Sequence, residues 1–253
     1  YLTIDESKIE AAITKNTCGI LATHVYGNPC NVEAIDKIAK KHNLKVIYDA
    51  AHCFGVSFKD KSIFDFGDIS TCSFHATKIF HTSEGGAIFC NQKSIQKKIF
   101  DYHNFGHEDN ISFNGLGING KMSEVHAAMG LTVLNHMDEI FSNRKEIISN
   151  YNKKLNFKKF KTISIRNNTS WNNSYYPIIF NNEKLLNKAE IKLNENQIFP
   201  RRYFYPSLNK LPYVKYKHME SAEQIAKKIM CLPLYPSLGK GNQKQIITII
   251  NNI

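Results

Sequence analysis

The chain has 253 residues, of which 42% are hydrophobic, enough for one large domain or for a large and a small one. No run of 18 apolar residues occurs, which excludes a membrane-spanning helix, and the opening YLTIDESKIE does not have the pattern of a signal peptide. The formal net charge of +11 comes largely from scattered lysines and favours anionic partners, but no nucleic-acid-binding signature accompanies it.

The six cysteines form no CxxC pair and do not cluster with histidines. We therefore expect no disulfide framework and no metal site. Buried thiols of this kind are typical of a reducing compartment, so we expect a cytoplasmic protein. The residues are Cys18, Cys30, Cys53, Cys72, Cys90 and Cys231.

The first half of the chain alternates strand and helix patterns. The apolar run CGILATHVYG predicts a strand, and NVEAIDKIAKKHN predicts a helix with Asn31 as its N-cap. The segments KVIYDAA, FGDIS, CSFHA and GGAIFC predict further short strands. Strands separated by helices predict a mainly parallel sheet, in which ligands gather at the carboxyl ends of the strands. Asp49 lies at such an end.

The second half is more helical at first. Residues 121–155 predict a long helix interrupted by Gly130, of the kind that connects a large domain to a small one. Beyond it, TISIRNN, SYYPIIF, RRYFYPSL and helical patterns at 182–193 and 221–230 predict a small α+β unit. The domains expected are a large one over 1–135, a connecting helix over 136–155 and a small one over 156–253.

Lys78 stands out in the segment CSFHATKIFHTSEGGAIFC. It lies at the edge of apolar segments, and Gly85 and Gly86 after it indicate a close approach to the backbone. A lysine in a partly dry pocket loses its proton readily and can form an imine with an aldehyde. Pyridoxal 5'-phosphate is the obvious partner for such a lysine.

This cofactor makes further demands on its binding site. Its ring nitrogen needs a carboxylate, which Asp49 can supply, and its phosphate needs N–H groups and hydroxyls, which Ser73 and Thr77 can supply. Singly, each of these residues is as readily explained as a cap or turn residue. Their common order and spacing around Lys78 is what favours the cofactor.

The stretches DAAHCFG, DISTCSFHATKIFHTSEGGAIF and GINGKMSEVHAAMG resemble the DegT/DnrJ/EryC1/StrS family of sugar aminotransferases. The resemblance implies the fold type I, aspartate-aminotransferase-like architecture of pyridoxal phosphate enzymes: a mainly parallel sheet with helices on both faces and a small C-terminal α+β domain. Family members also have an N-terminal portion with a Gly-Thr phosphate motif and a stacking aromatic residue. Neither is found here, so we expect that this part is missing.

The resemblance also implies roles for single residues. Lys78 matches the lysine that forms the imine with the cofactor, and Asp49 the aspartate that pairs with the pyridinium nitrogen. His52 stands where the family presents a residue to the phenolic oxygen, and Ser73 matches the phosphate-binding serine. Asn119 matches an asparagine that reaches the phosphate from the neighbouring subunit, which implies a homodimer with shared active sites. Arg201 aligns with an arginine common near the active site.

The reaction implied is amino transfer from L-glutamate to a nucleotide-linked keto sugar. The FHATK form is similar to members that aminate C4 of dTDP-4-keto-6-deoxyglucose for O-antigen, lipopolysaccharide or related sugars. Amination at C3, or of a UDP or GDP sugar, remains open. Dehydratases of the same fold carry histidine in place of the lysine, so Lys78 argues against that branch. A non-catalytic, degenerate or truncated member that acts as a binding or regulatory protein is the remaining alternative.

Overall fold

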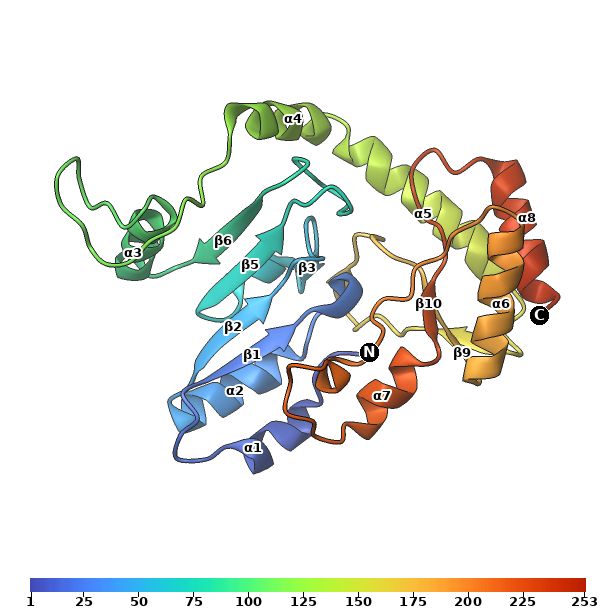
Figure 1. The fold of residues 1–253 in the computed structure, drawn as a ribbon, viewed down its shortest axis with the longest axis horizontal. Coiled ribbons are helices and arrows are strands. Elements are labelled where there is room, and N and C mark those ends of the chain that lie inside the picture. Colours follow the sequence, from blue (N-terminus) through green and yellow to red (C-terminus); the bar gives the residue numbers. More distant parts are fainter. The chain divides into compact units, whose positions relative to one another are not determined.

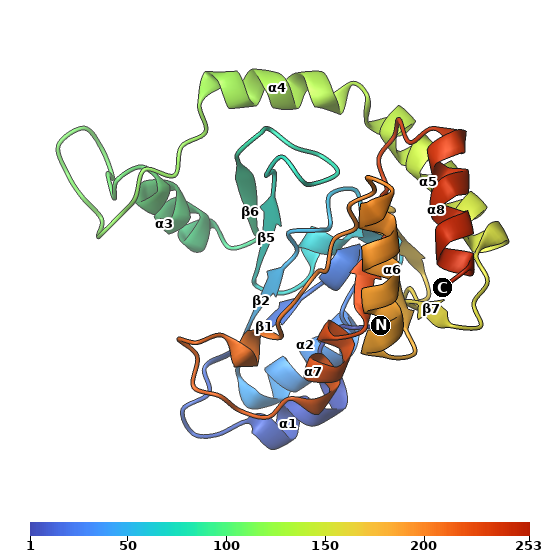
Figure 2. The same cartoon turned by 45° about the vertical axis from the view of Figure 1, so that its right-hand side comes forward.

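The computed structural model describes residues 1–253 and divides into two compact units (Figures 1 and 2). The first unit comprises Tyr1–Met137 and Ile165–Asn172, and the second comprises Asp138–Ser164 and Asn173–Ile253. No helix in residues 1–253 combines the length and the apolar character needed to cross a membrane.

The first unit is built on a four-stranded sheet in the order β1-β2-β5-β6. Its strands are β1 (Gly19–Thr23), β2 (Lys45–Asp49), β5 (Ile69–Ser73) and β6 (Gly86–Cys90). The first three are parallel and β6 is antiparallel to β5, so the prediction of a mainly parallel sheet is confirmed. The prediction of two strands, one in FGDIS and one in CSFHA, was wrong. They form the single strand β5, because the chain turns at Gly67 (φ +79°) before it and enters a loop after Ser73.

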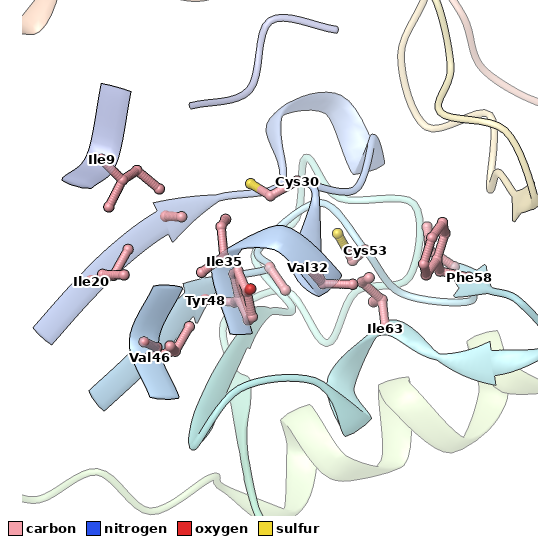
Figure 3. Close-up of a cluster of buried hydrophobic side chains, with 14 residues drawn as sticks. Ile9, Ile20, Cys30, Val32, Ile35, Val46, Tyr48, Cys53, Phe58 and Ile63 are labelled. Atoms are coloured by element: carbon pink, nitrogen blue, oxygen red, sulfur yellow. The ribbon is translucent and has the colours of Figure 1, made fainter. Parts of the chain in front are cut away.

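Helix α2 (Val32–His42) covers one face of β1 and β2 (Figure 1). As predicted, Asn31 caps it: the side-chain oxygen accepts the N–H of Ala34 at 3.2 Å. Asn43 ends it in the left-handed conformation, which asparagine tolerates well. Its apolar side contributes to a cluster of buried side chains between the helix and the sheet, drawn in Figure 3. Labelled members include Val32, Ile35, Val46 and Tyr48.

The remaining elements of the first unit are short, except for two helices. These helices are α3 (Lys93–His103) and α4 (Glu124–Leu134). The short elements are α1 (Ile9–Ala12), the 3-10 turns Glu6–Lys8, Val25–Gly27 and Ile63–Asp65, and a small antiparallel sheet of β3 (Ser57–Phe58), β4 (Lys61–Ser62) and β8 (Thr169–Ser170).

The long helix predicted over residues 121–155 is two helices, α4 and α5 (Met137–Lys154). The break lies after Leu134 and not at Gly130, which is inside α4. Ser123 begins α4 by accepting the N–H of His126, so residues 121–123 precede the helix.

The second unit contains a three-stranded antiparallel sheet in the order β10-β9-β7. Its elements are most of α5, β7 (Phe160–Thr162), β9 (Pro177–Phe180), α6 (Glu183–Glu195), the 3-10 turn Leu208–Lys210, α7 (Glu220–Ala226), β10 (Ile229–Cys231) and α8 (Lys240–Asn251). The helix predicted at 182–193 corresponds to α6. The helix predicted at 221–230 ends early, at Ala226, because Met230 belongs to the fully buried strand β10.

Candidate active site

The carboxyl edge of the large sheet brings Asp49 and Ser73 to one face. Asp49 ends β2 and pairs with Thr71, and Ser73, two residues further along β5, pairs with Gly86. Paired residues share a face, as do residues two apart, so Asp49, Thr71 and Ser73 lie on the same side. The Oδ1 atom of Asp49 accepts the N–H of Ala51 at 3.1 Å.

Lys78 lies in the loop from residue 74 to residue 85, which joins β5 to β6 at this edge. The glycines that follow it serve the chain's own packing. A Cβ at Gly85 would clash with Thr82 Oγ1, and one at Gly86 would lie 2.8 Å from the carbonyl oxygen of Cys72. The close approach that the glycines predicted is therefore an approach of neighbouring protein atoms.

Helix α4 meets the same loop at Gly130. A Cβ added there would lie 2.7 Å from Thr82 Cγ2 and 3.5 Å from Phe80 Cζ. The glycine that the sequence suggested as a helix interruption is thus a contact point that holds α4 against the Lys78 loop.

Partial burial favours the uncharged form of the Lys78 amine. Loss of solvent lowers the pKa of its amine, and the nearby Asp49 carboxylate opposes that shift in part. In the same surroundings, burial raises the pKa of the Cys72 thiol to about 12, so Cys72 stays protonated at neutral pH. The amine is the group of this pair that becomes a nucleophile more easily than usual.

His52 is held in one tautomer. Its Nδ1 atom accepts the backbone N–H of Tyr26 at 3.0 Å, so Nδ1 carries no hydrogen and Nε2 carries it. Burial, followed by repulsion from the Lys78 cation, lowers the pKa of His52 to about 3. At neutral pH the ring is therefore uncharged, with Nε2–H as its donor.

The sequence patterns did not predict the side chains that hold the backbone around His52. The Asn172 side chain donates to the carbonyl oxygens of His52 (2.8 Å) and Phe54 (2.9 Å), and the Trp171 indole donates to the carbonyl oxygen of Tyr26 (2.9 Å). Gly27 makes room for the Asn172 side chain, since a Cβ at Gly27 would lie 2.9 Å from Asn172 Oδ1. Its φ of +77° also favours glycine. In the sequence, the one sign of these contacts is that Trp171 is the only tryptophan of the chain. Patterns of strands and helices do not indicate which residue a tryptophan contacts.

Two of the residues singled out in the sequence belong to other segments of the chain. Asn119 is exposed, its backbone pairs with Asn104 beyond α3, and its Oδ1 accepts from Lys121 Nζ at 2.7 Å. Arg201 belongs to the second unit, where its backbone pairs with Cys231 and its guanidinium donates to the Tyr203 hydroxyl at 2.7 Å.

Comparison with known proteins gives this arrangement a family. The chain is 43% identical over 253 residues to dTDP-4-amino-4,6-dideoxy-D-glucose transaminase of Shigella dysenteriae, covering 97% of this chain and 69% of that protein. It is 32% identical to GDP-perosamine synthase of Escherichia coli O157:H7, covering 98% of this chain and 68% of that protein. The chain thus spans about two thirds of the length of the curated relatives it matches.

A solved structure shares the fold. The crystal structure of DesI in the presence of its TDP-sugar product superimposes with a TM-score of 0.91 at 26% sequence identity, covering 99% of this chain and 66% of that one. The architecture is therefore fold type I. The model of the DegT/DnrJ/EryC1/StrS aminotransferase family matches residues 1–251, and the chain belongs to this family of pyridoxal phosphate-dependent enzymes.

Proposed function

We propose that this chain carries the catalytic lysine of an aminotransferase that acts on a nucleotide-linked keto sugar. The observation that carries the proposal is the position of Lys78: a partly buried amine, with a lowered pKa, beside Asp49 and the neutral His52. Such surroundings are typical of a lysine that reacts as an uncharged amine, and the family supplies the cofactor with which it reacts.

The residues present fit pyridoxal phosphate. Asp49 presents a carboxylate oxygen on the site face, which suits a protonated ring nitrogen. The Nε2–H of His52 suits a phenolic oxygen, because the bond from Tyr26 leaves the ring no donor at Nδ1. The hydroxyl of Ser73 lies on the same face and suits the phosphate. We assign these three residues and Lys78 as the residues that hold the cofactor.

When bound, the cofactor supplies an electron sink that lets an amino group leave one substrate and enter another. The residues of the chain transfer protons, through Lys78, and hold a negative charge, on Asp49, beside the reacting groups. Lys78 Nζ, uncharged more easily than in water, takes a proton from the substrate carbon and returns it. Asp49 lies near Lys78, and its carboxylate favours the protonated form of the Lys78 amine.

The proposed amino donor is L-glutamate, and the proposed acceptor is dTDP-4-keto-6-deoxyglucose, aminated at C4. The name of the Shigella dysenteriae relative, at 43% identity, supports the dTDP sugar. The GDP-perosamine synthase, at the lower identity of 32%, keeps a GDP sugar as the competing acceptor. We assign Arg201 to substrate binding and the product to surface-polysaccharide or O-antigen synthesis in the cytoplasm.

We also propose that the active enzyme is a homodimer in which Asn119 serves the partner's site. Several large apolar side chains in residues 111–131, the segment that contains Asn119, are exposed, and a second copy could cover them. They are Ile111 (91% exposed), Leu116 (96%), Ile118 (70%), Val125 (78%) and Leu131 (67%). Sedimentation of the wild type and of Leu116→Glu tests this: the wild type should be dimeric and the variant shifted toward monomer. A wild type that is monomeric at every concentration tested would contradict the proposal.

A coupled assay tests the activity itself. The protein is incubated with pyridoxal phosphate, glutamate and either dTDP-4-keto-6-deoxyglucose or its GDP counterpart, and amino sugar and 2-oxoglutarate are measured. We expect equal amounts of both products, a preference for the dTDP sugar, and none of either with Lys78→Ala. Product formation by Lys78→Ala would contradict the role of the lysine. Cofactor and sugar binding without turnover by the wild type would favour the alternative of a non-catalytic binding protein.

A further inference from the structure

The loop that carries Lys78 contains a chain of contacts that the proposed function does not use. The Nδ1 atom of His75 accepts the backbone N–H of Thr77 at 3.2 Å and lies 2.9 Å from its hydroxyl oxygen. The opposite ring atom, Nε2, lies 3.7 Å from Glu84 Oε1. The three side chains thus join the start of the loop to its end.

These contacts define the tautomer of His75. A backbone N–H can only donate, so Nδ1 carries no hydrogen and the Thr77 hydroxyl donates to it as well. The neutral ring then carries its hydrogen on Nε2, which faces the Glu84 carboxylate. A carboxylate in that place stabilises this tautomer, as in other sites where one group orients a histidine for another.

The backbone connects His75 directly to the lysine. The N–H of Lys78 donates to the carbonyl oxygen of His75 at 2.9 Å, and Thr77, which the ring holds, is the residue before Lys78. The backbone of Glu84 is itself held, since its N–H donates to the Thr82 carbonyl (2.9 Å) and its carbonyl accepts from the Thr82 hydroxyl (2.7 Å). The ring therefore closes a tight turn whose last residue is Lys78.

We propose that His75 is a positioning residue for Lys78, and that Glu84 holds His75 in the tautomer that closes the turn. The proposal rests on the proposed function in that Lys78 is the reactive amine. It assigns His75 no contact with the cofactor or the substrate. It predicts that what matters is an acceptor at the place of Nδ1, and not the imidazole as such.

Two substitutions separate these possibilities. In His75→Asn the side-chain oxygen stands near the place of Nδ1 and can still accept the N–H of Thr77. In His75→Ala no acceptor remains. His42→Ala is the matched control, because His42, the last residue of α2 and not part of the Lys78 loop, also pairs with a glutamate (Nε2 to Glu10 Oε1, 2.8 Å). Thermal unfolding by circular dichroism establishes which variants are folded.

The first readout needs no cofactor. Trace acetylation of the protein over a range of pH, followed by mass spectrometry, gives the reactivity of each lysine amine. We expect the midpoint for Lys78 to lie below that of ordinary lysines in the wild type, in His75→Asn and in His42→Ala. In His75→Ala it should move up toward the ordinary value, because the freed loop lets water reach the amine.

The second readout is the extent of borohydride trapping of pyridoxal phosphate on Lys78. His75→Ala should trap about tenfold less at subsaturating cofactor, the effect of one hydrogen bond, and His75→Asn about as much as the wild type. Glu84→Gln should fall between them. If His75→Ala keeps the wild-type midpoint and trapping, or if His75→Asn is as impaired as His75→Ala, the proposal is overturned. A wild type that traps nothing on Lys78 refutes the proposed function, and the acetylation profiles then decide on His75 alone.

Discussion

Two buried histidines should make the first unit less stable in acid, at pH values well above those at which carboxylates titrate. His24 and His52 are 0% and 8% exposed, and burial lowers the pKa of each from 6.5 to about 3. Both rings accept a backbone N–H through Nδ1, from Cys30 (2.9 Å) and from Tyr26 (3.0 Å). The folded protein therefore keeps both neutral, while the unfolded chain protonates them near pH 6.5.

The sign and the size of the effect follow from this difference. Because the unfolded state binds more protons between pH 6.5 and 3, stability is fully present above pH 6.5 and is lost as the pH falls. Between pH 7 and pH 5 each histidine should lower the free energy of unfolding by about 2 kcal/mol, and the two together by about 4 kcal/mol. Carboxylates titrate mainly below this window and add little to it.

Urea unfolding at pH 7, 6 and 5, followed by the fluorescence of Trp171, measures the effect. Trp171 is the only tryptophan, and it is bonded to the carbonyl oxygen of Tyr26 next to His52, so it reports on this unit. His52→Asn, which keeps an acceptor near Nδ1 but cannot be protonated, should lose about half of the pH dependence. His42→Asn, the same substitution at the pair with Glu10, is the control variant. Equal pH dependence in the wild type and in His52→Asn would refute the reasoning.

Three further results are expected. Asn172→Ala removes a buried hydrogen bond to the carbonyl of His52 and a partly buried one to the carbonyl of Phe54. It should destabilise the first unit by about 1–3 kcal/mol and weaken pyridoxal phosphate binding, and an unchanged urea midpoint and affinity would count against the role of Asn172. Gly27→Ala places a side chain at a left-handed backbone position and close to Asn172. It should lower the free energy of unfolding in urea by about 1–2 kcal/mol or more. A variant as stable as the wild type would be inconsistent with the crowding at Gly27. The Glu223 carboxylate bonds to the side chains of Lys210, Asn209 and Tyr216. Glu223→Ala should therefore speed tryptic cleavage at residues 210–217, because the segment opens more often. Equal cleavage rates in the variant and the wild type would show that this carboxylate does not anchor the segment.

Much of the first unit could be predicted because its local patterns and its tertiary structure agree. The spacing of apolar residues and the Asn31 cap define α2, and the apolar runs of β1 and β2 define buried strands. The register that places Asp49 and Ser73 on one face also follows once the strands are parallel. Here the sequence period and the fold specify the same arrangement.

The rest depends on contacts between residues far apart in the chain. Asn172 meets His52 across 120 residues, and no local pattern connects the two. The tautomer of His52 depends on the N–H of Tyr26, whose unusual backbone (φ +58°) is set by its surroundings and not by its side chain. The break between α4 and α5 and the early end of α7 show the same limit, because packing and strand pairing override helix propensity there.

The central claim is that Lys78 is the one amine of this chain built to bind pyridoxal phosphate. The most direct measurement is to add the cofactor at low concentration, reduce with borohydride, digest the protein and locate the modified lysines by mass spectrometry. We expect a single adduct on Lys78, lost in Lys78→Arg without new adducts elsewhere. Labelling spread over the surface lysines, with Lys78 no more modified than the others, would contradict the claim.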